Sequence, residues 1–547
     1  MDGRARSAQV AAELLAVTRD RLDVSPEAAI ASWDPSLDPQ QVASVRVEGR
    51  LASPDALIGR YEALVAAEPD ERVARGAWFT PPPVVEGVLD LAGVKAGERV
   101  CDPACGAGAF LLAAWRRGAR VSGMDVDPAA VAAARGALWW ASGAPWSRFG
   151  EADVVQGDAL LTDWSRTFDA VVGNPPFLGQ LSRATAFNRQ VAAALADRYG
   201  VTAYADAAAL FQLLAASLLA PGGRSALLAP ASWLGARDSG PIRRRLAADL
   251  DPVAMWLSMD RSFPQAMVFP TLVVLQRGGS PPPEVRRALD STFRSVAPLR
   301  LSRDAWRAAD TWSPFLASAT GIPSVAPSGP LLESCATVHA DFRDQYYGLV
   351  DAIREGEDGP RLVTVGAIGL GRCRWGEARI RFGGRSWERP VVDRAALTPA
   401  MTAWAEARCV PKLLVATQKP TLCVAVDERG SWLPSVPVIS VVPRDPSRLW
   451  HLAAALASPP AAAWAASRSL GTGLSPRVIK LAAREVRQLP LPSPGPAWDR
   501  AAEALRQLGA EGGDPAVFAR LATEAYGIPV DPLVPWFLGR LRGRAER

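Results

Sequence analysis

Four consecutive residues have side chains that suit the binding of a flat ring carrying an amine. They are Asn174-Pro175-Pro176-Phe177, and a short apolar run, 168–172, comes directly before them. The two prolines stiffen the backbone, and the Asn174 side-chain oxygen and the Pro175 carbonyl can accept hydrogen bonds from an exocyclic amine. The Phe177 ring can stack on a planar group. A proline-rich surface turn after a strand is the alternative interpretation.

Three aspartates also follow short apolar runs. Asp102 begins the run Asp-Pro-Ala-Cys-Gly-Ala-Gly, Asp125 follows the apolar residues near 121, and Asp158 follows 153–156. Asp125 can accept hydrogen bonds from ribose hydroxyls and Asp158 from an adenine amine. The alternatives are a turn-capping role for Asp102 and solvated carboxylates at helix starts for Asp125 and Asp158.

The glycine-rich turn after Asp102 narrows the choice of ligand. Gly106 and Gly108 allow a ligand to approach backbone N–H groups, but Leu111 stands where a dinucleotide fingerprint has its third glycine. The pattern therefore indicates an adenosine without phosphates. S-adenosylmethionine fits, with Asp102 near its aminocarboxypropyl end.

These residues require elements that end at one edge of a sheet. We expect strands over 99–101, 120–123, 153–156 and 168–172, alternating with helices over 82–91, 109–116 and 129–140. Strands that alternate with helices predict a doubly wound α/β sheet, which binds ligands at the carboxyl ends of its strands. A helix over 206–220 and strands over 225–229 and 271–276 would complete the sheet.

Composition limits the other chemistry that the chain can perform. Its 547 residues predict two or three domains, and its charge of +5 comes mainly from arginine, which favours contacts with phosphate and guanine. Six cysteines without a C-x-x-C pair and only two histidines argue against a zinc site, a disulfide framework or a histidine-centred triad. We find no apolar run long enough for a membrane span and no signal core, which predicts a cytoplasmic protein.

The order of these motifs resembles the TaqI-like, gamma-class DNA methyltransferases that act on adenine N6, with their type IIG restriction-modification relatives. Trp78-Phe79-Thr80-Pro81 comes first, the 102–108 turn and the aspartates follow, and Asn174 to Phe177 comes last. The resemblance implies a Rossmann-like class I methyltransferase domain. This sequence departs from TaqI in having phenylalanine at Phe177, and aspartate replaces glutamate at Asp125.

The resemblance also implies site residues. Asn174, Pro175, Pro176 and Phe177 would hold a flipped adenine, and Phe263 would be a second stacking aromatic. The residues implied to bind S-adenosylmethionine are Phe79, Thr80, Asp102, Ala104, Gly106, Gly108, Asp125 and Asp158. Asn174 and Pro175 would orient the N6 lone pair for an in-line methyl transfer, accelerated mainly by positioning.

The second half of the chain contains the candidate DNA surface. Strand-like segments alternate with turns from 361 to 442, and Arg372, Arg374, Arg379 and Arg381 would share strand faces beside Trp375 and Phe382. Lys412 is a further candidate for contact with DNA. A solvated, salt-bridged strand surface is the alternative.

We therefore expect five segments. They are a helical N-terminal extension (1–72), the methyltransferase domain (73–280), a linker (281–330), an α+β target-recognition domain (331–492) and a helical tail (493–547). We also expect Thr80 to cap the helix that starts after it.

Partners follow from the same residues. We expect a monomer that binds double-stranded DNA. Residues Gly93, Val410, Thr417 and Val478 stand two places before the four lysines, so the carboxylate-x-Lys pattern of common nucleases does not occur. Restriction or defence activity would then come from a separate protein.

Two other functions remain open. An Asn-Pro-Pro-aromatic turn also occurs in methyltransferases that act on RNA or on a protein glutamine. A non-catalytic DNA-binding defence subunit could keep the fold, although the intact aspartates and Asn174 argue against it.

Overall fold

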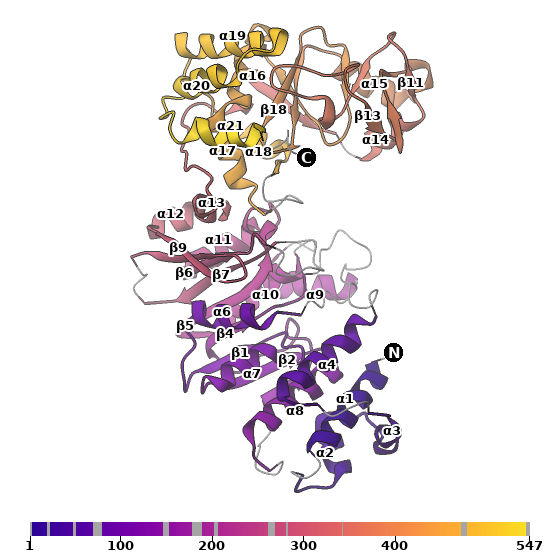
Figure 1. The fold of residues 1–547 in the computed structure, drawn as a ribbon, viewed down its shortest axis with the longest axis vertical. Helices are drawn as coiled ribbons and strands as arrows, with labels where there is room; N and C mark the ends of the chain where they lie inside the picture. Colours follow the sequence, from indigo (N-terminus) through magenta and orange to yellow (C-terminus); the bar gives the residue numbers. More distant parts are fainter. Residues whose placement is uncertain are drawn as a thin grey trace. The chain divides into compact units, whose positions relative to one another are not determined.

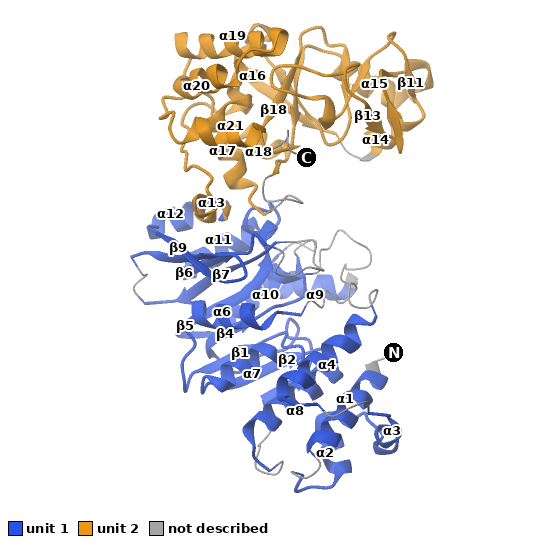
Figure 2. Ribbon diagram, viewed as in Figure 1, with its two compact units in different colours: residues 1–312 blue, residues 313–547 orange. Residues whose placement is uncertain are grey.

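The computed structural model describes most of the chain and divides it into two compact units, residues 1–312 and 313–547 (Figures 1 and 2). The described residues are 3–18, 22–47, 51–68, 79–145, 153–177, 189–201, 206–260, 269–279, 283–341, 343–471 and 478–542. Trp78 of the 78–81 motif and Phe263 of the predicted site lie outside them.

A nine-stranded sheet forms the centre of the first unit. Its strands are β1 (Arg99–Asp102), β2 (Arg120–Asp125), β3 (Asp153–Gln156), β4 (Phe168–Gly173), β5 (Leu219–Pro230), β6 (Leu250–Leu257), β7 (Pro270–Arg277), β8 (Val285–Leu289) and β9 (Arg294–Leu299). Their order is β3-β2-β1-β4-β5-β7-β6-β8-β9. The first five run parallel, and β7 is antiparallel to both its neighbours. The predicted α/β class is confirmed.

Helices precede or connect the strands of this sheet. They are α6 (Pro82–Ala92), α7 (Ala109–Arg116), α8 (Pro128–Ser142), α9 (Arg189–Tyr199), α10 (Ala207–Leu218) and α11 (Gly240–Asp249). The Asp127 carboxylate accepts from the Ala129 N–H at the start of α8, and Pro128 occupies a first-turn position that needs no donor. The four helices expected over 82–91, 109–116, 129–140 and 206–220 therefore form within a few residues of their predicted bounds, as α6, α7, α8 and α10.

The sheet is larger than the sequence suggests. Strand β6 was not predicted, because Asp251 and Pro252 interrupt its apolar pattern and an irregularity in its pairing falls there. The Pro221-Gly-Gly223 triplet was expected to separate a helix from a strand, but it lies inside β5. Strand β5 pairs with β4 at Leu219 and again from Arg224, so the triplet is an irregularity within the strand.

The expectation of a linker over 281–330 is wrong for its first half. Strands β8 and β9 extend the sheet, and helix α12 (Arg303–Ala308) follows them. Trp306 is buried, and its indole N–H donates to the Leu250 carbonyl at 2.9 Å. The glycine and proline residues over 321–329, near the end of the expected linker, do lie outside any helix or strand.

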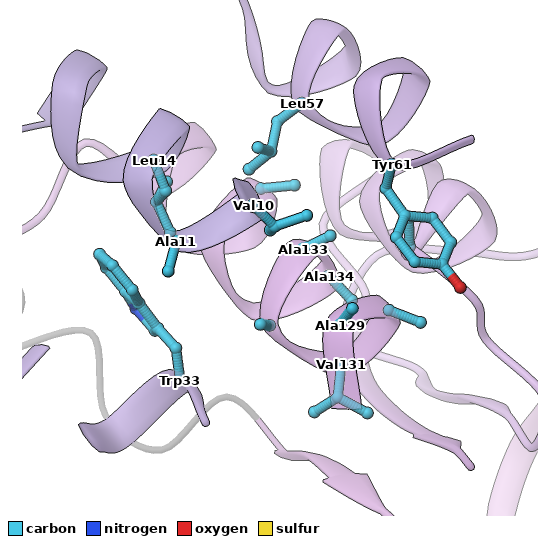
Figure 3. Close-up of a cluster of buried hydrophobic side chains, with 14 of the residues drawn as sticks. Val10, Ala11, Leu14, Trp33, Leu57, Tyr61, Ala129, Val131, Ala133 and Ala134 are labelled. Atoms are coloured by element: carbon cyan, nitrogen blue, oxygen red, sulfur yellow. The ribbon is translucent and has the colours of Figure 1, made fainter. Parts of the chain in front are cut away.

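Four N-terminal helices share a core with α8 (Figure 3). They are α1 (Gly3–Thr18), α2 (Pro26–Trp33), α3 (Pro39–Ser44) and α4 (Pro54–Ala66). Leu14, Trp33 and Leu57 are almost completely buried against the alanine-rich α8. A Cβ on Gly136 would lie 2.4 Å from Leu14 Cδ2, so this glycine allows α1 to approach closely. The helices expected over 1–72 are thus part of the first unit.

The second unit is α+β, as expected. One antiparallel sheet has the order β10 (Ala336–Ala340), β20 (Ile439–Pro443), β16 (Lys412–Ala416), β18 (Cys423–Asp427). A smaller sheet contains β11 (Ile353–Glu355), β15 (Pro390–Val392), β12 (Arg361–Val363) and β19 (Trp432–Pro434). A hairpin is formed by β13 (Ile380–Phe382) and β14 (Arg385–Trp387).

Helices complete this unit. They include α14 (Arg343–Val350), α15 (Pro399–Arg408), α16 (Leu449–Ala457), α17 (Pro459–Arg468), α18 (Ala483–Arg487), α19 (Pro496–Glu511), α20 (Pro515–Ala525) and α21 (Leu533–Arg542). The predicted tail contains three of them, and it packs on the unit: Trp498 Nε1 donates to the His451 carbonyl at 2.7 Å. Among the described residues, no helix has the length and apolar character needed to cross a bilayer.

Candidate active site

The predicted residues meet at the carboxyl ends of four adjacent strands. Asp102 ends β1, Asp125 ends β2, Asp158 follows β3 and Asn174 follows β4. All four line one pocket in the first unit. Strand β1 lies between β2 and β4, so the pocket opens where the strand order reverses, which is where doubly wound sheets bind ligands.

The pocket also has glycine and apolar walls. Its lining residues are Tyr61, Glu62, Phe79, Thr80, Asp102, Pro103, Ala104, Cys105, Gly106, Ala107, Ala109, Phe110, Asp125, Val126, Asp127, Gly157, Asp158, Ala159, Asn174, Pro176 and Phe211. The lining includes every predicted cofactor residue except Gly108.

The glycine-rich turn from β1 to α7 contains two glycines that have different structural roles. Gly106 has φ +51°, its N–H donates to Asp125 Oδ2 at 2.8 Å, and a Cβ there would meet no atom within 4 Å. Gly108 has φ +90°, and a Cβ would lie 2.9 Å from Ala134 Cβ on α8. Gly106 therefore keeps space free beside the pocket, and Gly108 allows close helix packing.

Asp102 connects this turn to the Asn174 segment. The side chain is 1% exposed, and its Oδ1 accepts from the Ala104 N–H at 3.1 Å. A Cβ on Gly173 would lie 2.4 Å from the same oxygen, so only glycine fits before Asn174. Burial raises the pKa of Asp102 to about 8, opposed by the Ala104 hydrogen bond and reinforced by the Asp125 charge. A nearby ligand cation would restore the charged form.

The other two carboxylates also hold their own turns. Asp125 Oδ2 accepts from Gly106 and Oδ1 from the Asp127 N–H at 2.9 Å. Asp158 Oδ1 accepts from the Leu160 N–H at 3.0 Å. The turn-capping role considered for Asp102 is therefore present, whereas Asp125 and Asp158 hold turns after their strands and do not stand at helix starts, because the N-cap of α8 is Asp127. Each carboxylate oxygen has a second lone pair, so these bonds leave capacity for a ligand.

Asn174 is held by a residue far away in the sequence. Its Nδ2 donates to Thr80 Oγ1 at 3.0 Å. Thr80 was expected to cap α6, but the N-cap position is Pro81, and no side-chain cap bond forms. The hydroxyl points to Asn174 instead.

The remaining residues of the turn have different environments. Pro176 lines the pocket with Asn174, and Pro175 is buried. Phe177 is half-buried and packs against the core cluster that contains Val84 and Val172. Stacking of a base on Phe177 stays a prediction.

Several residues that line the pocket were not predicted from the sequence. Tyr61 and Glu62 come from α4, and Phe211 comes from α10; nothing in their local sequence points to a ligand site. Val126 did carry a signal, because it directly follows Asp125, and its exposed fraction of 60% is unusual for a large apolar residue.

The charge of the pocket limits the ligands that it can hold. Glu62, Asp102, Asp125, Asp127 and Asp158 line it, whereas no arginine or lysine occurs among its described lining residues. Burial raises the pKa of Glu62 to about 7. Carboxylates repel a phosphate group and attract a cation, so the pocket favours a nucleoside with a positive charge over a nucleotide.

The residues predicted to contact DNA have different environments in the structure. The prediction for Lys412 is wrong, because its side chain is fully buried and its Nζ lies 2.5 Å from Asp427 Oδ2. Arg372 pairs with Glu377 at 2.6 Å and Arg379 with Glu388 at 3.3 Å, as the salt-bridged alternative describes. Arg374 donates to the Gly366 carbonyl at 3.0 Å, and Arg381 is exposed on β13.

The aromatic residues expected beside these arginines point elsewhere. Phe382 is buried in the core of the second unit, and Trp375 Nε1 donates to the Pro390 carbonyl at 2.9 Å. Contact of the four arginines with DNA stays a prediction.

Comparison with known proteins identifies similar chains. The Type II methyltransferase M.TthHB8I of Thermus thermophilus is 29% identical over 208 residues, covering 37% of this chain and 44% of the relative. The tRNA (guanine(10)-N2)-dimethyltransferase of Methanothermobacter thermautotrophicus is 35% identical over 98 residues, covering 18% of this chain and 27% of the relative. The chain thus spans less than half the length of these relatives.

Solved structures of restriction-modification enzymes match most of the chain at low identity, and one example illustrates them. The type IIL restriction-modification enzyme MmeI in complex with DNA shows 13% identity and a TM-score of 0.47, covering 95% of this chain and 81% of that one. A likeness at this level carries no argument about function.

The match with a family model covers the part of the first unit that contains the pocket. The model is described as N-6 DNA Methylase, and it matches residues 52–277, from α4 to the end of β7. These bounds include every described residue that lines the pocket. The resemblance predicted from the sequence is therefore confirmed for this segment: residues 52–277 match the N-6 DNA Methylase family.

Proposed function

We propose that this chain is an S-adenosylmethionine-dependent methyltransferase that modifies the N6 amine of adenine in double-stranded DNA. The main observation in support of this proposal is the position of Asn174, which lines the same pocket as Asp102, Asp125 and Asp158 at neighbouring strand ends. The match of residues 52–277 with the N-6 DNA Methylase family supports the same reaction.

The lining residues fit the proposed methyl donor. Asp125 would accept from the ribose hydroxyls and Asp158 from the adenine amine, while Val126 offers an apolar surface for the adenine ring. The open space at Gly106 leaves room for a ligand beside the turn. The donor would supply a methyl group activated by a sulfonium, and the carboxylates around it complement that positive charge.

Asn174 would position the amine that receives the methyl group. Its amide oxygen and the Pro175 carbonyl would accept the two N6 hydrogens and so direct the nitrogen lone pair towards the methyl carbon. The new N–C bond forms as the C–S bond breaks, and the nitrogen then loses one proton to water. The residues contribute by orientation, so no histidine is needed.

The target base must leave the duplex for this geometry. Unstacking costs a few kcal/mol, and stacking on the Phe177 ring would recover part of it. We assign target recognition to the second unit, with exposed Arg381 as the first residue to test. A restriction or defence setting with a separate nuclease and a monomeric state are parts of the same proposal.

RNA is the second candidate substrate. The observation in its favour is the 35% identity over 98 residues to a tRNA (guanine(10)-N2)-dimethyltransferase. Asn174 and Pro175 would accept hydrogen bonds from an exocyclic amine of either nucleic acid.

One experiment separates these substrates. Methyl-labelled S-adenosylmethionine is offered with mixed-sequence duplex DNA, total RNA and protein, and the modified nucleoside is identified by mass spectrometry. We expect label only in DNA, as N6-methyladenine. Label that moves to RNA or protein instead would overturn the proposal.

Variants connect the reaction to the pocket. We expect Asn174→Ala to lower transfer roughly 100-fold or more while S-adenosylmethionine still binds, because the amine loses its orienting group. Gln276→Ala is the matched control, since this amide donates to the Gly222 carbonyl and does not line the pocket. Transfer retained by Asn174→Ala would remove Asn174 from the reaction centre.

A further inference from the structure

Helix α4, which precedes the sheet in the chain, forms one wall of the pocket. Tyr61 is buried and its hydroxyl donates to Asp127 Oδ2 at 3.1 Å. The Tyr61 and Phe79 rings meet edge-to-face with centroids 6.4 Å apart. Leu57, one turn earlier, is buried in the same core as α8. The helix is therefore fixed against the end of β2.

The Tyr61 bond belongs to a connected set of contacts that reaches the glycine-rich turn. Asp127 accepts from Tyr61, and its own N–H donates to Asp125 Oδ1 at 2.9 Å. Asp125 Oδ2 in turn accepts from Gly106. Helix α4 thus adjoins the part of the pocket where Asp125 is proposed to bind the ribose.

Glu62 follows Tyr61 and lines this pocket. A helical glutamate is usually solvated or paired with a basic residue three or four positions away. The residues at those positions are Ile58, Gly59, Val65 and Ala66, none of which is basic. Glu62 is only partly exposed. No basic residue therefore stands at a pairing position for Glu62 on α4, and Arg60 of the same helix pairs with Glu13 at 2.7 Å.

We infer that Glu62 is a binding residue of this pocket, which accepts a hydrogen bond from a ribose hydroxyl of the adenosyl ligand. This inference rests on the proposed function, because it takes S-adenosylmethionine as the ligand. Asp125 already holds two backbone N–H groups, so a second carboxylate near the end of β2 provides a further acceptor for the diol. The raised pKa of Glu62, caused by burial, agrees with a carboxyl group that gains its partner from the ligand.

The inference gives α4 a role in the reaction site. The helix would provide a ligand contact and would also hold Asp127 at the start of α8. Ligand binding should then stabilise the packing of the N-terminal helices on α8, since the ligand binds only when they are docked.

Isothermal titration calorimetry on the full chain tests this role without DNA. The ligands are S-adenosylhomocysteine and 5′-methylthioadenosine, which share the ribose but differ in the amino-acid part. We expect Glu62→Gln to weaken both ligands roughly 10-fold, because a hydrogen bond to a charged acceptor is lost. Glu62→Asp, which keeps the charge, should bind more tightly than Glu62→Gln. Glu86→Gln is the matched control, since Glu86 pairs with Arg117 on the surface.

Each outcome is decisive. Equal binding by wild type and Glu62→Gln would overturn the inference alone. Weaker binding of S-adenosylhomocysteine with unchanged methylthioadenosine would also overturn it, because the partner would then be the ammonium group. If the wild type bound neither ligand, the proposed function would fail and the inference with it. Thermal unfolding of each variant shows whether a loss of binding reflects a loss of folding.

Discussion

Asn174 Nδ2 donates a hydrogen bond to Thr80 Oγ1 across 3.0 Å, and this bond ties the turn after β4 to the segment before α6. An amide has one donor end and one acceptor end. Because Thr80 holds the donor end, the Asn174 oxygen is directed away from Thr80, as the proposed recognition of an amine requires. Thr80 thus acts on the reaction through Asn174, as a positioning residue.

Removal of the Thr80 hydroxyl should separate positioning from cofactor binding. We expect Thr80→Val to lower the rate of methyl transfer roughly 10-fold through loss of one hydrogen bond, while the dissociation constant of S-adenosylmethionine stays unchanged. Thr80→Ser should retain the rate. Single-turnover kinetics and calorimetry measure the two quantities. A weaker cofactor with an unchanged rate would instead support the direct cofactor contact that the resemblance implies.

A side chain at Gly173 should destabilise the first unit. A Cβ there would lie 2.4 Å from Asp102 Oδ1, and the φ of +150° disfavours any residue other than glycine. We expect Gly173→Ala to lower the free energy of unfolding by about 1–3 kcal/mol, in the range of a strained backbone conformation. Gly59→Ala on α4 is the control, because a Cβ meets no atom there. It should be neutral or stabilising, and equal effects of the two changes in urea denaturation would contradict this account.

The raised pKa of Asp102 predicts how stability varies with pH. Burial raises the pKa to about 8 in the folded protein from 3.8, so the folded state binds this proton more tightly than the unfolded state. The stability associated with this group is complete below pH 3.8 and is lost as the pH rises through about 8.

Asp102→Asn should remove this dependence. Urea denaturation at each pH measures the unfolding free energy of both proteins. We expect the difference between the variant and the wild type to shift in favour of the variant as the pH rises from 5 to about 8. Glu62 and Asp206, whose pKa values burial also raises, should leave a residual slope in both proteins. Parallel curves for the two proteins would show that Asp102 is already ionised in the folded state.

The buried Lys412 should contribute to stability rather than to DNA contact. Its Nζ pairs with Asp427, whose carboxylate also accepts from the Ser431 and Trp432 N–H groups. We expect Lys412→Ala to cost about 3–5 kcal/mol of unfolding free energy, because the buried Asp427 charge loses its counter-ion. Arg372→Ala, which breaks an exposed pair, should cost about 1 kcal/mol or less. A loss of DNA affinity by folded Lys412→Ala without a loss of stability would reverse this assignment.

Local patterns were sufficient for the strand ends of the first unit. The apolar runs before Asp102, Asp125, Asp158 and Asn174 form parallel strands, because alternation of short strands and helices leaves few topologies. Strand β6 escaped prediction because Pro252 conceals its pattern. Glycine and proline clusters suggested a linker over 281–330, although β8 is paired within the sheet. Glycine and proline content indicates where the chain turns. It does not indicate which strands the residues between two turns will pair with.

The sequence by itself was sufficient to predict that Asp102, Asp125, Asp158 and Asn174 lie together. The reason is that the carboxyl ends of adjacent parallel strands meet at one edge of the sheet. Only the tertiary structure brought Glu62 to the pocket, Thr80 to Asn174 and Lys412 into the core. These three outcomes depend on contacts between residues distant in the chain. Helix periodicity does not specify which other element a polar side chain will meet.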